Sequence, residues 1–576
     1  MQSPNESSWQ VPVCALHLVD PGLSPSHRAQ MSKLRHEPFS QIAAWGDIKE
    51  KAHFESVPQV ARSSRMVRFV AFVAAATLAG CVCASIDDVI NSLKLPLTSE
   101  KLQKDITLPA LKIHAKVLQS FADKSNGTRV FGSKGHNASV DYVATIAKLA
   151  GYDVKRQTFP YDFSQVLSQS FTAGSPINIS VMTYSPSTPT GGVTAPLVLI
   201  PDPDAAPSPG CTAADYSGID VKGKIALIQR GGCTFAIKAT NAKTAGAAGA
   251  IIYNNVDGTL SGTLGVPDAT AYAPVAGISK ADGESLVARL NGGAVTGTLN
   301  IQTLNEQRYS SNVIATSKAG NQSNIVFIGG HLDSVAAGPG INDNGSGSIT
   351  VLELAIQLAK YKLKNAVRFA WWTAEEYGLV GSEYYVANLP EAERKKIALY
   401  INLDMVASPN YVYAIYDGDG SAGKNPGPTP PGSGAIEKVF VDYLASKNIS
   451  SVPTSFDGRS DYGPFIAEGV NIPAGGLFTG AEGIKTPEQQ KLFGGTAGVA
   501  YDVNYHAKGD TYDNLNFTAF LVNAKASAHA IATFIDSTKV VDDEKAAAGL
   551  APRQIAPGPN DNAPAQGKHL CVGDLA

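Results

Sequence analysis

Gly-Gly-His-Leu-Asp-Ser at residues 329–334, with Gly-Ile-Asn-Asp-Asn-Gly-Ser-Gly close behind it at residues 340–347, is the stretch around which the chain is organised. An apolar run before the first motif predicts a strand, and the glycine-rich second motif opens a segment with helical apolar spacing. His331, Asp333 and Asp343 therefore follow the carboxyl end of a strand, where open α/β sheets build their ligand sites. A histidine and two aspartates in this position suggest the first half of a metal centre, so the rest of the chain must supply further ligands.

Strands and helices alternate throughout residues 306–540. Such alternation indicates an α/β fold with a mainly parallel central sheet flanked by helices. Residues 85–184 are assigned to the N-terminal part of the same domain. The expected strands are 152–159, 324–329, 366–372 and 398–404, and the expected helices are 85–125, 139–150, 349–360, 435–447 and 518–535.

A chain of 576 residues is too long for one hydrophobic core, so two or three domains are expected. Apolar residues make up 44% and charged residues 17%, which indicates a globular protein. The net charge is 47 − 50 = −3, which gives no electrostatic basis for binding nucleic acid. None of the six cysteines has the spacing of a metal site, so any metal must be held by histidines and carboxylates.

Both ends of the chain differ from this globular pattern. Residues 66–84 combine a positive charge, about fifteen uncharged positions and small residues at the end, which is the layout of a secretory signal. We favour Met66 as the true start, with residues 1–65 untranslated or unstructured; in the alternative, the segment anchors an uncleaved chain. The tail at 541–576 is rich in Ala, Pro, Asp and Gly and is expected to be disordered. We expect an extracellular protein, with a vacuolar location as the alternative.

Two further features agree with secretion. Cys211 and Cys233 lie close together in the sequence, and in an oxidising compartment they could form a disulfide. Asn344 begins an Asn-x-Ser/Thr sequon, but it adjoins the proposed metal site and is not counted as a glycosylation site. The candidate glycosylation sites are Asn126, Asn137, Asn178, Asn321, Asn448 and Asn516.

Residues 185–305 have a different composition, dominated by glycine, alanine, proline and short β-branched runs. Residues 223–235 predict a strand that leads into a helix, and residues 249–254 predict the next strand. These segments, Gly-Lys-Ile-Ala-Leu-Ile-Gln-Arg-Gly-Gly-Cys-Thr-Phe and Gly-Ala-Ile-Ile-Tyr-Asn, resemble the protease-associated domain. The resemblance implies a smaller β-rich domain inserted into the larger one. No histidine lies between residues 137 and 330, so no catalytic site is expected there.

Later strand ends and loops offer the ligands that the first motif lacks. A Glu-Glu pair follows one strand, Asp404 ends another, and His506 lies in a loop before the last helix. A carboxylate in an apolar strand is costly unless it is paired or bound to a metal. Two zinc ions about 3.5–4 Å apart need roughly five side-chain ligands when one carboxylate bridges them. The set that meets this need is His331, Asp343, Glu376, Asp404 and His506, which leaves Glu375 as a general base.

The same motifs resemble the M28 family of zinc aminopeptidases, and the inserted domain points to its leucine-aminopeptidase and aminopeptidase-Y-like branch. The resemblance rests on Gly-His-Leu-Asp-Ser, Asn-Asp-Asn-Gly-Ser-Gly, Ala-Glu-Glu-Tyr-Gly, Asn-Leu-Asp-Met and Tyr-His, and it extends from about residue 86 to 540. It implies the zinc exopeptidase fold. It also implies two zinc sites, one with His331 and Asp404, the other with Glu376 and His506, and a bridge between them through Asp343.

The resemblance also assigns roles around the ligands. Glu375 would be the base and proton shuttle, and Asp333 would orient the first histidine ligand. Tyr505 and Arg459 match positions near the substrate, so a substrate-binding role is implied for them. The peptide bond between residues 343 and 344 would be cis, which is rare outside proline.

We therefore predict a secreted di-zinc aminopeptidase that hydrolyses the N-terminal bond of peptides and proteins, through a water between the metals with Glu375 as general base. A monomer is favoured, without nucleic acid and without stable membrane association once the signal is cleaved.

A non-catalytic receptor-like ectodomain, the first rival, would be expected to have lost ligands. A glutaminyl cyclase would be expected to lack the inserted domain. A carboxypeptidase would need a cationic pocket, for which Arg459 alone gives little support.

Overall fold

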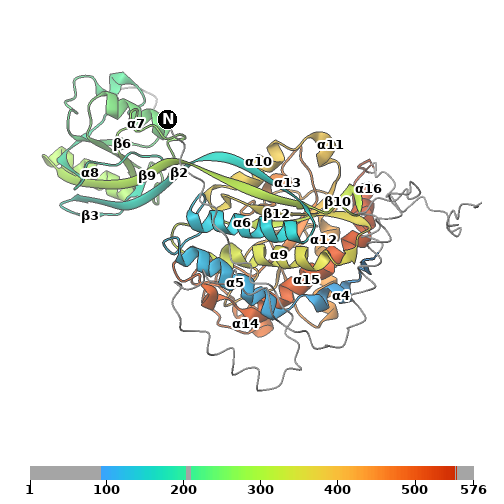
Figure 1. The fold of residues 1–576 in the computed structure, drawn as a ribbon. Helices are drawn as coiled ribbons and strands as arrows, with labels where there is room; N and C mark the ends of the chain where they lie inside the picture. Colours follow the sequence, from blue (N-terminus) through green and yellow to red (C-terminus); the bar gives the residue numbers. More distant parts are fainter. Residues whose placement is uncertain (1–92, 203–208, 552, 554–576) are drawn as a thin grey trace, which may run out of the picture. The chain divides into compact units, whose positions relative to one another are not determined.

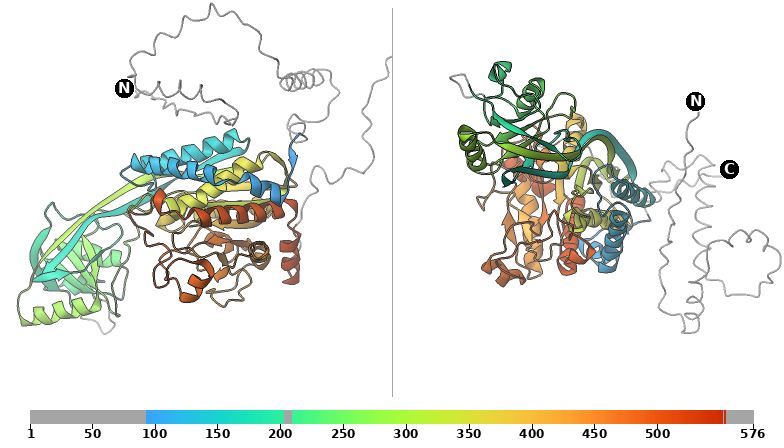
Figure 2. Two further views of the ribbon diagram at one scale, coloured as in Figure 1. Left: turned by 90° about the horizontal axis from the view of Figure 1, so that it is seen from below. Right: turned by 90° about the vertical axis from the view of Figure 1, so that its left-hand side faces the viewer.

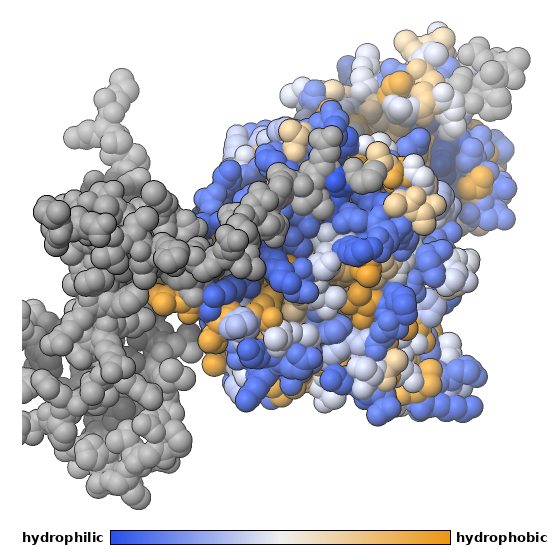
Figure 3. All heavy atoms as spheres, turned by 90° about the vertical axis from the view of Figure 1, so that its right-hand side faces the viewer, coloured by the Kyte–Doolittle hydropathy of each residue, from blue (hydrophilic) through white to orange (hydrophobic). Residues whose placement is uncertain are grey.

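The computed structural model describes residues 93–202, 209–551 and 553. Our expectations for residues 1–65, for the signal-like segment at 66–84 and for the tail from residue 554 onwards lie outside the described residues. Within the described part of the chain, no helix combines the length and the apolarity needed to cross a membrane. On the face drawn in Figure 3, hydrophilic residues predominate and apolar residues lie singly or in small groups.

A mainly parallel sheet forms the centre of the larger domain, as the alternation of strands and helices predicts. β10 (Asn321–His331) lies in the middle and pairs in parallel with β12 (Asn365–Trp372) and β13 (Ile397–Leu403). Its apolar run at 325–328 is almost completely buried because both faces of the strand are covered. The sheet continues through β16 (Ala474–Phe478), β14 (Ala414–Tyr416) and β15 (Val452–Thr454), of which β14 is antiparallel to β16.

Helices cover both faces of this sheet (Figure 1). On one face α10 (Val380–Ala387) and α13 (Gly463–Ile466) pack over aromatic residues, and Phe465 stacks on Tyr400 with ring centroids 4.0 Å apart. The other face holds the main hydrophobic core, and its helices lie side by side (Figure 2, left). They are α4 (Ser99–Asp105), α5 (Leu108–Asp123), α6 (Lys134–Leu149), α9 (Gly347–Leu358), α12 (Ser433–Ser446) and α15 (Phe517–Asp536).

The N-terminal segment of the larger domain differs from the sequence expectation at two points. Where a helix was expected, β1 (Leu95–Pro96) pairs in parallel with β11 (Tyr361–Lys362). α6 begins at residue 134 rather than 139, because the Ser133 side chain accepts a hydrogen bond from the backbone N–H of His136 and thereby caps the helix.

Two long strands link the larger domain to the inserted one. β2 (Asp153–Ala173) and β9 (Thr296–Thr316) have 21 residues each and pair in antiparallel fashion along almost their whole length. β9 pairs with β12 at one end and with β5 (Val193–Leu199) at the other. We expected the inserted domain to end at residue 305, but β9 runs through that position, so the second boundary lies within a continuous strand.

The inserted domain is built on four parallel strands, β5, β6 (Ile225–Gln229), β7 (Gly249–Tyr253) and β8 (Val275–Ile278). The short β4 (Ser180–Val181) pairs with β8 in antiparallel fashion. α7 (Phe235–Thr244) contributes to the hydrophobic core on one face, and α8 (Lys280–Gly292) contributes to the core on the other.

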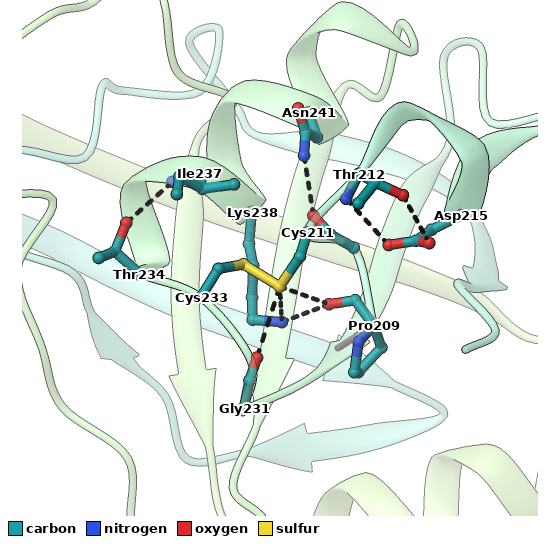
Figure 4. Close-up of a disulfide and its surroundings, with 11 residues drawn as sticks. Pro209, Cys211, Thr212, Asp215, Gly231, Cys233, Thr234, Ile237, Lys238 and Asn241 are labelled. Atoms are coloured by element: carbon teal, nitrogen blue, oxygen red, sulfur yellow. Dashed lines mark hydrogen bonds between the residues drawn. A yellow bond between two sulfur atoms is a disulfide. The ribbon is translucent and has the colours of Figure 1, made fainter. Parts of the chain in front are cut away.

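Cys211 and Cys233 form the expected disulfide, with an S–S distance of 2.04 Å (Figure 4). Lys238 of α7 is buried beside it and donates hydrogen bonds to the carbonyl oxygen of Pro209 and to the sulfur of Cys211. Burial lowers the pKa of Lys238 to about 8. The disulfide therefore ties the segment before β6 to the start of α7.

A last helix, α16 (Lys539–Ala547), extends beyond residue 540, where we expected a disordered tail to begin. Val541 is fully buried. The carboxylate of Glu544 accepts three hydrogen bonds from the N-terminus of α12, whose first N–H groups have no partner within the helix. The donors are Gly432 at 2.7 Å, Gly434 at 3.2 Å and Ala435 at 2.6 Å.

Replacing Glu544 by Ala should lower the free energy of unfolding by about 1–2 kcal/mol, because three N–H groups at the start of α12 lose their acceptor. The midpoint of thermal unfolding, measured by circular dichroism, should fall by roughly 2–8 °C. Asp543 is the matched control, since it lies on the same helix and pairs with Lys539 on the surface. Asp543→Ala should shift the midpoint by less than about 1 °C. Equal shifts in the two variants would contradict the capping role.

Candidate metal centre

The side chains singled out by the sequence motifs lie together at the carboxyl edge of the central sheet. Several of them end or follow β10, β12 and β13, which are parallel neighbours and therefore converge at this edge. The others come from the segment before α9 and from the loop before α15. In chain order, the residues are His331, Asp343, Glu375 with Glu376 in the short turn η5 (Glu375–Tyr377), Asp404 and His506.

The two carboxylate oxygens of Asp343 face different histidines. Oδ1 lies 3.3 Å from Nε2 of His331, and Oδ2 lies 3.1 Å from Nε2 of His506. On the first side, Oδ1 of Asp404 is 3.5 Å from the same nitrogen of His331. On the second side, Oε2 of Glu376 is 2.9 Å from the same nitrogen of His506. The donor atoms therefore form two groups that share Asp343.

The donor atoms of these groups fit metal ions. Four of the five side chains are buried, and only that of His506 is substantially exposed, at 41%. Oε1 of Glu376 and Oδ1 of Asp404 have no hydrogen-bond partner among the described residues, which is costly for a buried carboxylate. Imidazole nitrogens and carboxylate oxygens, several of them within 4.8 Å of one another, are the ligands that zinc accepts.

Burial and neighbouring charges shift the pKa values of these groups. Burial raises the pKa of Glu376 to about 7, and the charge of Asp343 adds to the rise. Burial alone would lower the pKa of His506, but its bonds to Asp343 and Glu376 raise it to about 10. The pKa of Asp343 is held below its usual range, against the effect of burial, by His331 and His506. The two histidines thus do not neutralise all of the buried carboxylates, and this favours the binding of metal cations.

Glu375, the expected base, lies beside the first group of candidate ligands. Its Oε2 lies 3.7 Å from Nε2 of His331, and burial, together with the charge of Asp404, raises its pKa well above the usual range. The backbone N–H of Glu375 donates to Oδ1 of Asp333 at 3.2 Å. The fully buried Asp333 also lies 3.6 Å from Nδ1 of His331, so it contacts both the first histidine and the turn that holds Glu375.

Two more buried carboxylates, Asp510 and Asp461, lie near the centre, and neither is predicted from the sequence as a site residue. Asp510 accepts hydrogen bonds from the backbone N–H groups of Asn342 at 2.8 Å and Asp343 at 2.9 Å. Burial raises the pKa of Asp510 to about 8. Asp461 is fully buried, and burial raises its pKa to about 8 as well. The place of Asp510 beside residues 342 and 343 is visible only in the fold, because about 170 residues of sequence separate them.

Three residues of the centre have left-handed backbone conformations, which side chains other than glycine rarely adopt. Ala374 (φ 58°) precedes the Glu-Glu pair, Met405 (φ 47°) follows Asp404, and His506 itself has a φ of 52°. Each costs on the order of 1–3 kcal/mol and turns a ligand out of its strand or loop. No feature of the sequence marks these positions. The expected cis bond between residues 343 and 344 is present.

A cavity of about 380 Å³ opens onto the ligands. Tyr505 and Arg459, which we expected near the substrate, both line it. Arg459 pairs with Glu482 at 2.9 Å and donates to the Tyr505 hydroxyl at 3.4 Å, and the Tyr505 ring stacks on His506. The apolar part of the wall consists of Leu379, Met405, Tyr416, Tyr462, Phe478 and Ala481.

The candidate glycosylation sites differ in exposure. Asn321 is buried in β10, so a glycan there would remove native contacts, whereas Asn516 is half-buried at the start of α15. Burial therefore disfavours Asn321, and the other candidates stay predictions. The side chains that remain exposed are Asn126, Asn137, Asn178 and Asn448.

Comparisons with known proteins agree with this geometry. Residues 312–531 match peptidase family M28, and residues 193–286 match the PA domain. The chain is 51% identical over 412 residues to "Probable leucine aminopeptidase 2" of Aspergillus fumigatus, which covers 71% of this chain and 79% of that protein. It is 48% identical over 445 residues to the protein of the same name from Arthroderma benhamiae, with 77% and 87% covered.

One solved structure is similar to this chain along most of the length of both proteins. The aminopeptidase from Aneurinibacillus sp. strain AM-1 is 31% identical to this chain and superposes with a TM-score of 0.56, covering 75% of this chain and 95% of its own. High identity over most of the length of the curated relatives, together with the matched segments, identifies the family. The chain belongs to peptidase family M28 and contains an inserted PA domain.

Proposed function

We propose that this protein is a di-zinc aminopeptidase that hydrolyses the N-terminal bond of peptides and proteins. The observation on which the proposal rests is the geometry of Asp343, whose two oxygens face His331 on one side and His506 on the other. Asp404 would complete the first zinc site and Glu376 the second. The aminopeptidases to which the chain is similar support the same activity.

Zinc held by these ligands would supply an activated water and polarise the carbonyl of the scissile bond. We assign proton transfer to Glu375, which lies close to His331 and Asp404 but is not needed as a ligand once His331, Asp404 and Asp343 hold the first zinc. It would take the proton of the attacking water and pass it to the leaving amine. Asp333 would orient His331 through Nδ1 and hold the backbone of Glu375 at the same time.

The cavity supports an apolar N-terminal residue as the substrate side chain, because much of its wall is aliphatic or aromatic. The protonated α-amine of a peptide would bind among the carboxylates at its inner end. A carboxypeptidase would instead need a free cation for the terminal carboxylate. Among the described residues that line the cavity, Arg459 is the one arginine or lysine, and it is paired with Glu482. The receptor-like alternative is disfavoured because the five candidate ligands are present and converge.

We also propose that the protein is secreted. The disulfide between Cys211 and Cys233 supports folding in an oxidising compartment, and four sequons present exposed asparagines. The signal-like segment at 66–84 stays a prediction. A monomer is the favoured state.

The bridging role of Asp343 can be tested by counting zinc ions. After dialysis against trace zinc, wild-type protein should retain two per chain by atomic absorption. Asp343→Ala should retain fewer than one, because both sites lose a ligand, whereas His506→Ala should retain one. His529→Ala is the control, since this histidine bonds to Ser99 away from the centre, and it should retain two. Equal zinc contents in the Asp343 and His506 variants would contradict the bridge.

Glu375→Gln should lower kcat by about 10²–10⁴-fold, because the amide cannot accept the proton of the water. Zinc content should stay at two per chain, and KM should change less than threefold, since the substrate contacts are retained. Glu383→Gln on the exposed face of α10 provides the control and should have wild-type kinetics. Residual activity within tenfold of wild type in the Glu375 variant would rule out its assignment as the base.

Blocking the α-amine of the substrate tests whether the enzyme requires a free N-terminus. Leucyl-p-nitroanilide should be hydrolysed, and N-acetyl-leucyl-p-nitroanilide should react at least about a hundredfold more slowly, because the acetyl group removes the cation that the carboxylates bind. Aspartyl-p-nitroanilide, with an anionic side chain facing an apolar wall, should also be poor. The release of p-nitroaniline measures all three rates. Preferential hydrolysis of the acetylated substrate would overturn the aminopeptidase proposal.

A further inference from the structure

Arg129 is a fully buried arginine immediately behind the metal centre. It lies between α5 and α6, in a turn that precedes the segment matched to family M28 by about 180 residues of sequence, so no motif of the centre points to it. Its guanidinium donates three hydrogen bonds to backbone carbonyl oxygens. Nε donates to Pro339 at 2.9 Å, Nη1 donates to Leu332, and Nη2 donates to Gly340.

These three carbonyls belong to the two ends of one loop. Leu332 lies between His331 and Asp333, whereas residues 339–340 immediately precede the turn that holds Asp343. The backbone of Arg129 binds the same loop, because its N–H donates to the Ser334 hydroxyl at 2.9 Å and its carbonyl accepts from the Ser334 N–H at 3.2 Å. Arg129 therefore closes the loop by which the first histidine and the shared carboxylate are connected.

The loop is also held by other hydrogen bonds, from the Ser334 hydroxyl to the Gly338 carbonyl at 3.0 Å and from the Leu332 N–H to the Trp372 carbonyl at 2.8 Å. It consists largely of small residues, and its last position, Gly340, has a left-handed φ of 63°. On the far side of this turn, Asp510 accepts the N–H groups of residues 342 and 343. A buried guanidinium thus binds the carbonyls of the segment, and a buried carboxyl group accepts hydrogen bonds from its N–H groups. Together they fix where Asp343 stands relative to His331, 3.3 Å away.

An apolar side chain would fill the same space without the cost of a buried charge. Among the described residues, no carboxylate lies within ion-pair distance of Arg129, so it is not one half of a simple salt bridge. Burial lowers its pKa to about 10, and the charges of Asp333, Asp510 and Asp343 oppose the shift, so the guanidinium keeps its charge near neutral pH. The guanidinium offers Nε, Nη1 and Nη2 in one fixed plane, one to each carbonyl, whereas a lysine ammonium offers all its donors from a single nitrogen.

We propose that Arg129 is a positioning residue of the metal centre, whose guanidinium holds the two ends of the 332–340 loop so that His331 and Asp343 face a common metal position. The identity of the metal in this inference rests on the proposed function. The geometry of the loop does not depend on it. The positioning role predicts that the N-terminal segment, which contributes no metal ligand, determines the affinity of the centre for zinc.

The experiment compares Arg129→Lys and Arg129→Met with Arg308→Met in the full-length protein. Arg308 is the matched control because it too donates to a carbonyl near this turn, that of Phe131, and within the described part of the chain it forms no hydrogen bond or ion pair with the 332–340 loop. Zinc affinity is measured by competition with a chromophoric chelator. Hydrogen–deuterium exchange of peptides spanning 332–346 is measured on the metal-free protein. kcat and KM are measured at saturating zinc.

Both Arg129 variants should bind zinc about 10–100-fold more weakly than wild type. Their 332–346 amides should exchange faster, and kcat should fall with KM changed less than threefold. Arg308→Met should match wild type in all three. Arg129→Lys is decisive, because it keeps the charge and most of the volume even if the Met variant fails to fold. Wild-type zinc affinity and wild-type exchange in Arg129→Lys would overturn the proposal.

The readouts also separate this proposal from the proposed function. If wild type binds zinc but hydrolyses no aminoacyl anilide, the aminopeptidase proposal fails, while zinc affinity and exchange still decide the role of Arg129. If wild type is active and Arg129→Lys has unchanged affinity and exchange, the positioning role alone fails.

Discussion

The structure depends on a balance of charge at the carboxyl edge of the central sheet. Carboxylates are buried there side by side, and each would be unstable without a nearby cation or hydrogen-bond donor. Within the chain, His331 and His506 approach Asp343, and backbone N–H groups bind Asp510. This provision is incomplete, since Glu376 retains an unpartnered buried oxygen. In the proposed function, zinc supplies the missing positive charge. The buried carboxylates that would destabilise this edge of the sheet are therefore the groups that bind the metal.

The same requirement explains how closely the backbone is packed around the centre. The turn before α9 lies against the end of β13, where the Asn344 side chain donates to the Leu403 carbonyl at 2.8 Å and accepts from the Met405 N–H at 3.2 Å. A Cβ atom at Gly347 would lie 2.2 Å from the Leu403 oxygen, so only glycine permits this approach. Asn344 is also fully buried. The sequon that begins at this residue is therefore part of the centre and not a surface site.

The sequence predicts those parts of the molecule whose chemistry shows in the residue types themselves. A carboxylate such as Asp404 in an apolar strand is conspicuous, and strands separated by amphipathic helices indicate a parallel sheet. Parts that depend on distant contacts escape prediction. Arg129 looks like an ordinary turn residue until the fold brings it to a loop 203–211 residues away. The composition of α16 suggests a disordered tail, because Glu544 has no visible role without α12. Of the two long strands, only the beginning of β2, at 152–159, is predicted, because the rest of β2 and most of β9 are polar and show no clear alternation.

The placement of His506 and Asp510 near the end of the folded chain has a consequence for biosynthesis. The inserted domain is continuous in sequence, and its disulfide joins two nearby residues, Cys211 and Cys233, so its contacts can form early in translation. The metal centre is different, because its ligands are far apart in the sequence. The first, His331, is followed by the last, His506, only 175 residues later (506 − 331 = 175). A nascent chain that ends before His506 lacks one ligand of the second group. A peptidase arranged in this way can complete its metal centre only after almost the whole catalytic domain has been synthesised.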